Sequence, residues 1–263
     1  MINIVVCVKQ VLDPELPVSL FKVNPDTNKV IPPRGRSPVL SPFDENALEV
    51  ALKIKDSEEA TITVISMGSG IDEMVLRQTV ASGADELILL DDDSFQGIDS
   101  YSTAKALSAA IKKNGAYDLI VCGRQAADTN AGQVGTAIAD ILEIPVITLC
   151  GKVEVTDGKL KLERVLEDGS ETIESPMPAV VTVGYEIGDI REGDFKAEMR
   201  ADDQEITIWD SQDLDIDPSE LVSDDLRELA IPEGGVECNY IEGGSPEEIG
   251  EKLALELKDK QVI

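Results

Sequence analysis

Short apolar runs alternate with amphipathic segments along most of the chain. Five of these runs are continuous and β-branched, as expected for strands buried on both faces of a sheet: Ile2–Val8, Ala60–Met67, Glu86–Leu90, Asp118–Cys122 and Val146–Leu149. The stretch "MPAVVTVGY" (177–185) predicts a further buried strand. Strands that alternate with helices indicate an α/β fold with a doubly wound, mostly parallel sheet.

Helical patterns fill the gaps between these strands. "SPFDENALEVALKI" (Ser41–Ile54) offers Ser41 as the N-cap and Pro42 at the first helical position. Segments 71–85 and 100–115 are predicted to be helices for the same reasons, and the second is expected to end at Gly115. A final helix is expected over 245–260, with Ser245 and Glu248 as a capping box and an apolar stripe formed by Ile249, Leu253 and Leu257.

The pattern changes after Gly151. Residues 152–174 alternate by twos around Asp157-Gly158 and Asp168-Gly169, which predicts an antiparallel hairpin excursion from the sheet. Beyond Tyr185 no buried strand is evident: 186–206 reads as a charged loop, and 213–235 as short helical turns.

Composition narrows the functional classes. The net charge of −29 opposes binding to nucleic acid or anionic lipid, and no apolar run is long enough for a membrane span. The apolar N-terminus reads as a first buried strand, not a signal peptide. Four scattered cysteines favour a reduced, cytoplasmic setting without disulfides or a metal site. The absence of histidine removes the commonest general base, so any chemistry would belong to a bound cofactor.

Polar turns follow three of the expected strands, where ligands bind in an open parallel sheet. These turns are "VKQVLDPE" (8–15), Ser66–Gly70 and Gly123–Gly135. The third leads into a helix whose free N–H groups suit an anion, and Arg124 offers a charged fork to a phosphate. The residues alone leave two interpretations open, a nucleotide site or glycines that serve only backbone geometry. They favour Lys9 lying along the surface over Lys9 holding an anion, and a solvated turn over a metal cluster at Asp91–Asp93.

Several motifs together resemble the β subunit of electron transfer flavoproteins over essentially the whole chain. They are "VCVKQV" at the start, "SPFDENALEVALKIK", "TVISMGSGIDEMVLRQTVASGADELILL", the loop "CGRQAADTNAGQVG" and "RVLEDGSETIESPMPAVVT" (Arg164–Thr182). The resemblance implies an adenine-nucleotide α-hydrolase-like domain over 1–188. It also implies that 189–263 hold a partner-recognition loop and an acidic C-terminal arm that packs on an α subunit.

The family implies a heterodimer whose α subunit carries a redox FAD, while the β subunit binds a second adenine nucleotide. That nucleotide is structural AMP in many members, and in the electron-bifurcating members it is FAD, which accepts electrons from NADH and passes them to ferredoxin and to the other FAD. Gly132-Gln133-Val134-Gly135 resembles the flavin-type loop, so FAD is expected and AMP is the alternative.

Carried over by position, the resemblance implies cofactor contacts and no catalytic or metal-binding residue. The expected contacts are Cys7, Val8, Lys9, Ser41, Phe43, Ser66, Met67, Gly68, Gly123, Arg124, Gln125, Asp128, Gln133, Val134, Gly135 and Thr136.

The chain departs from the family pattern in the segment that, in other members, binds partner dehydrogenases. Residues 186–201 lack the family's Asn-x-Pro-Arg core, and Asp189-Ile190-Arg191 stands nearest to it. The expected partner is therefore a flavin-dependent dehydrogenase of either the acyl-CoA or the 2-hydroxyacid type. From Ala201 to Ile263 there are 19 acidic and 4 basic residues, which makes the arm strongly acidic.

A third hypothesis is a stand-alone nucleotide-binding stress-type protein or a hydrolase on a similar fold. It leaves the hairpin segment and the acidic arm unexplained, and the chain has no obvious P-loop.

Overall fold

A computed structural model describes residues 1–223, 229–230 and 238–263. Contacts divide the chain into two compact units, 1–228 and 229–263. Among the described residues, no helix is both long enough and apolar enough to cross a membrane.

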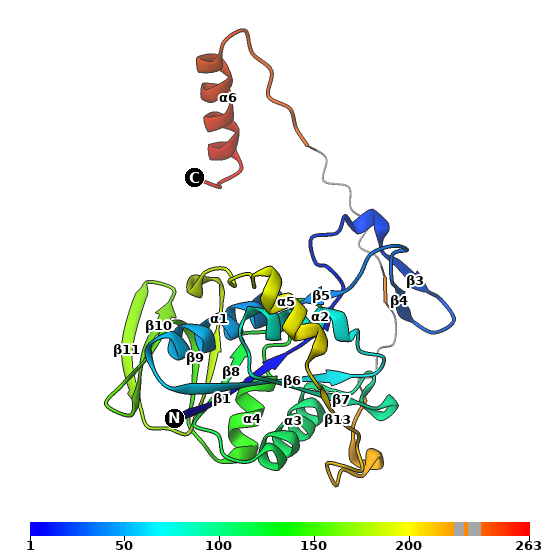
Figure 1. The fold of residues 1–263 in the computed structure, drawn as a ribbon. Coiled ribbons are helices and arrows are strands. Elements are labelled where there is room, and N and C mark those ends of the chain that lie inside the picture. Colours follow the sequence, from blue (N-terminus) through cyan, green and yellow to red (C-terminus); the bar gives the residue numbers. More distant parts are fainter. Residues whose placement is uncertain (224–228, 231–237) are drawn as a thin grey trace. The chain divides into compact units, whose positions relative to one another are not determined.

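A nine-stranded sheet forms the centre of the first unit (Figure 1). Its order is β11-β10-β9-β12-β8-β1-β6-β7-β13. In chain order the strands are β1 (Ile2–Val8), β6 (Ala60–Gly68), β7 (Glu86–Asp91), β8 (Leu119–Gly123), β9 (Val146–Thr156), β10 (Lys159–Leu166), β11 (Gly169–Ser175), β12 (Ala179–Val183) and β13 (Thr207–Trp209). The expected buried strands are therefore present, and the sheet is mostly parallel.

Strand order reverses at β1. The chain moves from β1 outward to β6 and β7, and then returns to place β8 on the other side of β1. Neighbouring loops leave the sheet in opposite directions at such a point, which opens a crevice at the carboxyl ends of the two strands. The switch point between β1 and β8 therefore positions the candidate site.

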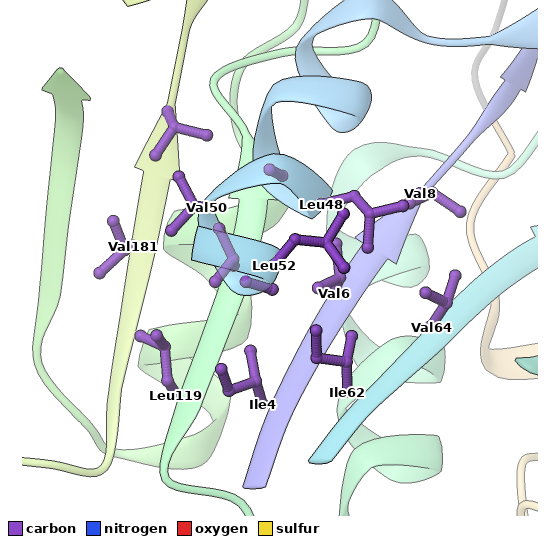
Figure 2. Packing of buried hydrophobic residues seen from close by; sticks show 14 of the residues in the cluster. Ile4, Val6, Val8, Leu48, Val50, Leu52, Ile62, Val64, Leu119 and Val181 are labelled. Carbon is purple, nitrogen blue, oxygen red and sulfur yellow. The ribbon is translucent and has the colours of Figure 1, made fainter. Parts of the chain in front are cut away.

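Helices cover both faces of the sheet (Figure 1). The helices α1 (Pro42–Ser57) and α2 (Glu73–Ser82) pack on one face, and α3 (Ser100–Asn114) and α4 (Val134–Leu142) pack on the other. Figure 2 shows Leu48 and Leu52 of α1 against the side chains of β1 and β6. Truncating such a fully buried leucine to alanine typically costs about 2–5 kcal/mol, so this layer contributes much of the core's stability.

Strand β9 is longer than expected, because it pairs with two different neighbours. It begins parallel to β12 and continues antiparallel to β10. Between these parts Leu149 adopts a φ of 58°, and the register with β12 slips by one residue. The strand expected to end at Leu149 therefore runs on to Thr156 through a bulge. The hairpin excursion is confirmed as β9-β10-β11, with Asp157 and Gly158 forming its first turn.

Two elements were not expected after Tyr185. The segment interpreted as a charged loop contains α5 (Phe195–Asp203), which packs on α2. Asp194 caps this helix by accepting a hydrogen bond from the N–H of Ala197. The short strand β13 adds to the sheet beside β7. Both elements precede Glu228 and so belong to the first unit.

Short elements complete the first unit. Two small antiparallel pairs are β2 (Gln10–Val11) with β5 (Val39–Leu40) and β3 (Lys22–Asn24) with β4 (Lys29–Ile31). The 3-10 turns are η1 (Val18–Leu20), η2 (Asp93–Phe95), η3 (Tyr185–Ile187) and η4 (Pro218–Glu220). Of the helical turns expected over 213–235, η4 is present, and residues 224–228 and 231–237 lie outside the described residues.

The second unit contains α6 (Pro246–Asp259). The Ser245 hydroxyl accepts from the N–H of Glu248 as expected, whereas the Glu248 carboxylate reaches the N–H of Gly244 and not that of Ser245. The expected apolar stripe is largely open to solvent, with Ile249 37% and Leu253 45% exposed.

Arg191 fastens the segment between η3 and α5 to helix α1. Its guanidinium donates to both carboxylate oxygens of Glu49, at 3.1 and 2.9 Å, and pairs with Asp56 at 2.8 Å. The backbone N–H of Arg191 also donates to Glu49, whose side chain is only 6% exposed. Among the described residues, Arg191 is the one cation that pairs with this buried carboxylate.

We expect Arg191→Met to lower the free energy of unfolding by about 1–3 kcal/mol, because Glu49 would remain buried without its cation. Urea denaturation followed by circular dichroism measures the change. Lys152→Met is the control, since it removes a cation from a solvent-exposed pair with Glu154, where the loss of stability should be small. Equal losses in the two variants would contradict this role for Arg191.

Candidate functional site

A cavity of about 600 Å³ lies at the switch point between β1 and β8. Its lining comes from the turn after β1, the turn after β6, the loop between β8 and α4, and the region from η2 into α3. The volume falls within the range of about 300–1,000 Å³ that is typical of small-molecule and cofactor sites.

Most of the expected contact residues meet in this cavity. Those that line it are Cys7, Val8, Lys9, Met67, Gly68, Gly123, Arg124, Gln125, Asp128, Gln133, Val134 and Gly135. They come from three separate strand ends, so the fold brings together turns that are far apart in the sequence.

Four expected contacts do not line the cavity. Ser41 lies beneath the loop, where its hydroxyl accepts from the N–H of Ala127 at 3.3 Å. Phe43 is buried, with its ring centroid 4.5 Å from that of Tyr185. The Ser66 hydroxyl is buried and has no hydrogen-bond partner within the part of the chain that the structure describes, and the Thr136 hydroxyl donates to the carbonyl of Gln133. Of these four, Ser41 and Phe43 contact the loop that lines the cavity, at Ala127 and Arg124.

The loop before α4 leaves the start of that helix open. Gln133 occupies the N-cap position, and its side chain makes no capping hydrogen bond. Gly132 has a φ of +64°, a conformation that favours glycine, and Gln125 stiffens the loop by donating to the side chain of Asn130. The first N–H groups of α4 thus remain available to an anion at the positive end of the helix dipole.

Two cations border the cavity in different ways. The Lys9 ammonium pairs with Asp128 at 2.6 Å, so it is held by a carboxylate rather than lying free along the surface. The Arg124 guanidinium lies 5.1 Å from the centre of the Phe43 ring and has no carboxylate partner among the described residues. Arg124 is therefore the cation that a phosphate could recruit without breaking an existing ion pair.

Asp44 holds the two central turns together from the α1 side. Its Oδ2 atom accepts from the N–H of Lys9 at 2.9 Å, and its Oδ1 atom accepts from the N–H of Gly123 at 3.2 Å. Burial raises the pKa of this carboxyl to about 7, although both backbone hydrogen bonds act against the rise. A methyl group on Gly123 would lie 2.4 Å from Oδ1, so only glycine fits this contact.

Sequence reasoning did not single out Asp44 as a site residue. The helix dipole alone explains an acidic residue in the first turn of a helix. The sequence therefore offered no sign that Asp44 also accepts hydrogen bonds from two turns of the candidate site. Sequence reasoning also missed one wall of the cavity, because its residues form no recognisable motif. This wall is made by Phe95, Ile98, Thr103 and Leu107.

The sheet order and the cavity define a class of protein: a doubly wound α/β domain with a ligand site at its topological switch point. Comparison with known proteins identifies the family. The electron transfer flavoprotein domain model matches residues 31–214.

Several relatives align with most of the chain. The chain is 42% identical over 220 residues to the electron transfer flavoprotein subunit beta of Thermoanaerobacterium thermosaccharolyticum, covering 83% of this chain and 82% of the relative. It is 37% identical to the caffeyl-CoA reductase-Etf complex subunit CarD of Acetobacterium woodii, covering 99% and 100%. It is 38% identical over 182 residues to the acryloyl-CoA reductase electron transfer subunit gamma of Anaerotignum propionicum, covering 68% and 66%.

The chain therefore belongs to the electron transfer flavoprotein family, where it groups with the β subunits and acts in electron transfer. The family resemblance of the sequence motifs is confirmed.

The raised pKa of Asp44 predicts a pH dependence of stability. Between pH 3.8 and about 7 the folded chain keeps the Asp44 proton that the unfolded chain has released. The contribution of Asp44 is therefore fully present below pH 3.8, falls by about 4 kcal/mol as the pH rises from there to about 7, and changes no further above that pH.

Asp44→Asn removes this titration. Urea unfolding of both proteins between about pH 5 and pH 8 should show the wild-type chain losing stability relative to the variant as the pH rises. A difference between the two proteins that stays constant with pH would contradict the assignment.

Proposed function

We propose that the chain binds FAD in the cavity at the switch point and works as the β subunit of an electron-bifurcating flavoprotein. In this proposal the FAD accepts electrons from NADH. The electrons pass to ferredoxin and, through the FAD of an α subunit, to or from a partner flavin dehydrogenase. The observation that carries the proposal is the set of twelve expected contacts that line one cavity, with Gln133 and Val134 of the flavin-type loop among them.

The polar side of the cavity suits the phosphates of a dinucleotide. The uncapped start of α4 would supply backbone N–H groups, and Arg124 would supply a charged donor. Lys9 would either keep its pair with Asp128 or exchange it for a phosphate oxygen. The residues present therefore fit an adenine dinucleotide chemically.

The apolar side of the cavity supports a ligand larger than a phosphate group. Met67, Phe95, Leu107 and Val134 all contribute to the lining. A flat aromatic ring is stabilised by such walls through burial and van der Waals contact. When bound, FAD would supply the electron-transfer chemistry, and the chain would orient it and shield it from water. Structural AMP, with a role limited to docking and electron transfer through the α subunit, is the alternative.

The relatives guide the choice of partner. Two of them are named as parts of caffeyl-CoA and acryloyl-CoA reductases, which supports an acyl-CoA type of dehydrogenase over the 2-hydroxyacid type. CarD aligns over 99% of this chain, so the alignment includes the acidic arm. We propose that the arm packs on the α subunit through the apolar stripe of α6.

A cofactor count separates FAD from AMP. The chain is purified with its α subunit, the cofactors are released with acid, and flavin and AMP are quantified. We expect two flavins and no AMP per heterodimer. One flavin with one AMP would replace the proposal with the structural alternative.

Bifurcation needs its own readout, in which the purified heterodimer is mixed with its partner dehydrogenase and ferredoxin. NADH should reduce ferredoxin only while an unsaturated acyl-CoA, the electron-accepting substrate of the dehydrogenase, is present, because one electron of each pair must go to ferredoxin and the other to that substrate. Ferredoxin reduction that ignores this substrate would contradict bifurcation.

Arg124→Met should weaken FAD binding by about ten- to a hundredfold, which corresponds to the loss of one hydrogen bond to a charged group. The midpoint of unfolding should barely change, because the guanidinium has no carboxylate partner among the described residues. Titration calorimetry on nucleotide-free heterodimer measures the affinity. The control is Arg36→Met, a change on the exposed surface outside the cavity lining; equal weakening in both variants would contradict a specific contact.

A further inference from the structure

Two thiols meet on the floor of the cavity. Cys7 near the end of β1 and Cys122 near the end of β8 are direct partners in the parallel register of these strands. Both residues line the cavity. Direct partners on adjacent strands have Cα atoms about 4.8 Å apart, which lies within the range of about 4.4–6.8 Å that a disulfide spans.

Both thiols are free in this structure, and both can be reached from the cavity. Both side chains are buried, and they belong to the core between the sheet and the helices α3 and α4. The hydrogen bond between the Cys122 S–H and the Cys7 sulfur, together with burial, raises the pKa of the Cys122 thiol well above its usual range. The neutral thiols should therefore react slowly at neutral pH and faster as the pH rises.

The other two cysteines provide a contrast. Cys150 is buried away from the cavity lining, and burial raises the pKa of its thiol to about 12. Cys238 is exposed and lies in the second unit. Of the four cysteines, only Cys7 and Cys122 combine a matched partner with access to the cavity.

We propose that Cys7 and Cys122 form a redox-sensitive dithiol that a peroxide converts to a disulfide only when the nucleotide is absent. One sulfur attacks a peroxide oxygen, and the O–O bond breaks to give a sulfenic acid and water. The second thiol then displaces the hydroxyl as another water, so that two thiols and one peroxide give one disulfide and two waters. The proposal rests on the proposed function only in taking the cavity as the nucleotide site.

Disulfide formation would act directly on the nucleotide-binding turns. On the opposite face of the sheet, Asp44 already links the backbone just beyond the two cysteines, because it accepts hydrogen bonds from Lys9 and Gly123. The start of α4 also rests on Cys122, since a methyl group on Gly135 would lie 3.3 Å from the Cys122 Cβ and 3.6 Å from its Sγ. Drawing the two sulfurs together would therefore shift the helix start that receives the phosphates.

The test uses the heterodimer with Cys238→Ser in this chain, which removes the exposed thiol. Nucleotide-free and nucleotide-loaded samples are treated with hydrogen peroxide, alkylated and digested with trypsin. Mass spectrometry should find the peptide of residues 1–9 linked to that of residues 114–124 in the nucleotide-free sample alone. Affinity for FAD and AMP should fall at least about tenfold on oxidation and return with dithiothreitol.

Because the oxidised and re-reduced samples contain the same protein, the comparison does not depend on a variant that folds. Cys122→Ser should abolish both the linked peptide and the sensitivity to peroxide, while Cys150→Ser should leave both unchanged. A missing link, a link that forms equally in the loaded sample, or a link without loss of affinity would overturn the proposal. Reduced protein that binds neither FAD nor AMP would instead reject the proposed function.

Discussion

The geometry of the cavity depends on one buried carboxylate. Asp44 accepts hydrogen bonds from the backbone of Lys9 and Gly123, and so fixes the distance between the ends of β1 and β8 at the point where strand order reverses. Parallel strands diverge into different loops there, and no backbone ladder continues to hold them. Asp44 lies in the first turn of α1, the helix that covers one face of the sheet. This helix therefore also sets the width of the gap between the ends of β1 and β8, where the cavity lies. Burial makes ionisation of the Asp44 carboxyl unfavourable. The hydrogen bonds that it accepts from the two backbone N–H groups offset part of this free-energy cost.

Much of this architecture follows from local pattern. Strands buried on both faces give continuous apolar runs, so β1, β6, β7, β8 and β12 could be predicted near their true bounds. The helix α5 could not, because five of its nine residues are charged and only Ala201 is buried in it. The strand β13 is three residues long and mostly exposed, which leaves too little periodicity for a prediction. The continuation of β9 past Leu149 depends on a bulge, which moves the side-chain alternation onto the other face.

The residues of the candidate site also fall into those that local sequence patterns predict and those that they do not. Residues in the polar turns after β1, β6 and β8 could be anticipated, because parallel topology places all strand carboxyl ends at one edge. The opposite wall could not, since Phe95 and Leu107 are ordinary core residues by every local criterion and acquire their place only from the docking of α3. Ser41 shows the limit of motif transfer. It is the N-cap by position, yet its hydroxyl supports the neighbouring loop at Ala127 instead of capping its own helix.

Net charge adds a final constraint on how such a chain could hold an anionic ligand. A formal charge of −29 repels phosphates at long range, but salt at physiological strength screens exposed charges beyond about 8 Å. Binding is therefore decided within the cavity, where the backbone N–H groups of α4 and the guanidinium of Arg124 act at short range in partly dehydrated surroundings. Backbone dipoles carry no net charge, so they provide an anion site without reducing the acidity of the surface. The acidic exterior and an anion-binding interior are thus compatible, and the exterior remains free to select partners by charge.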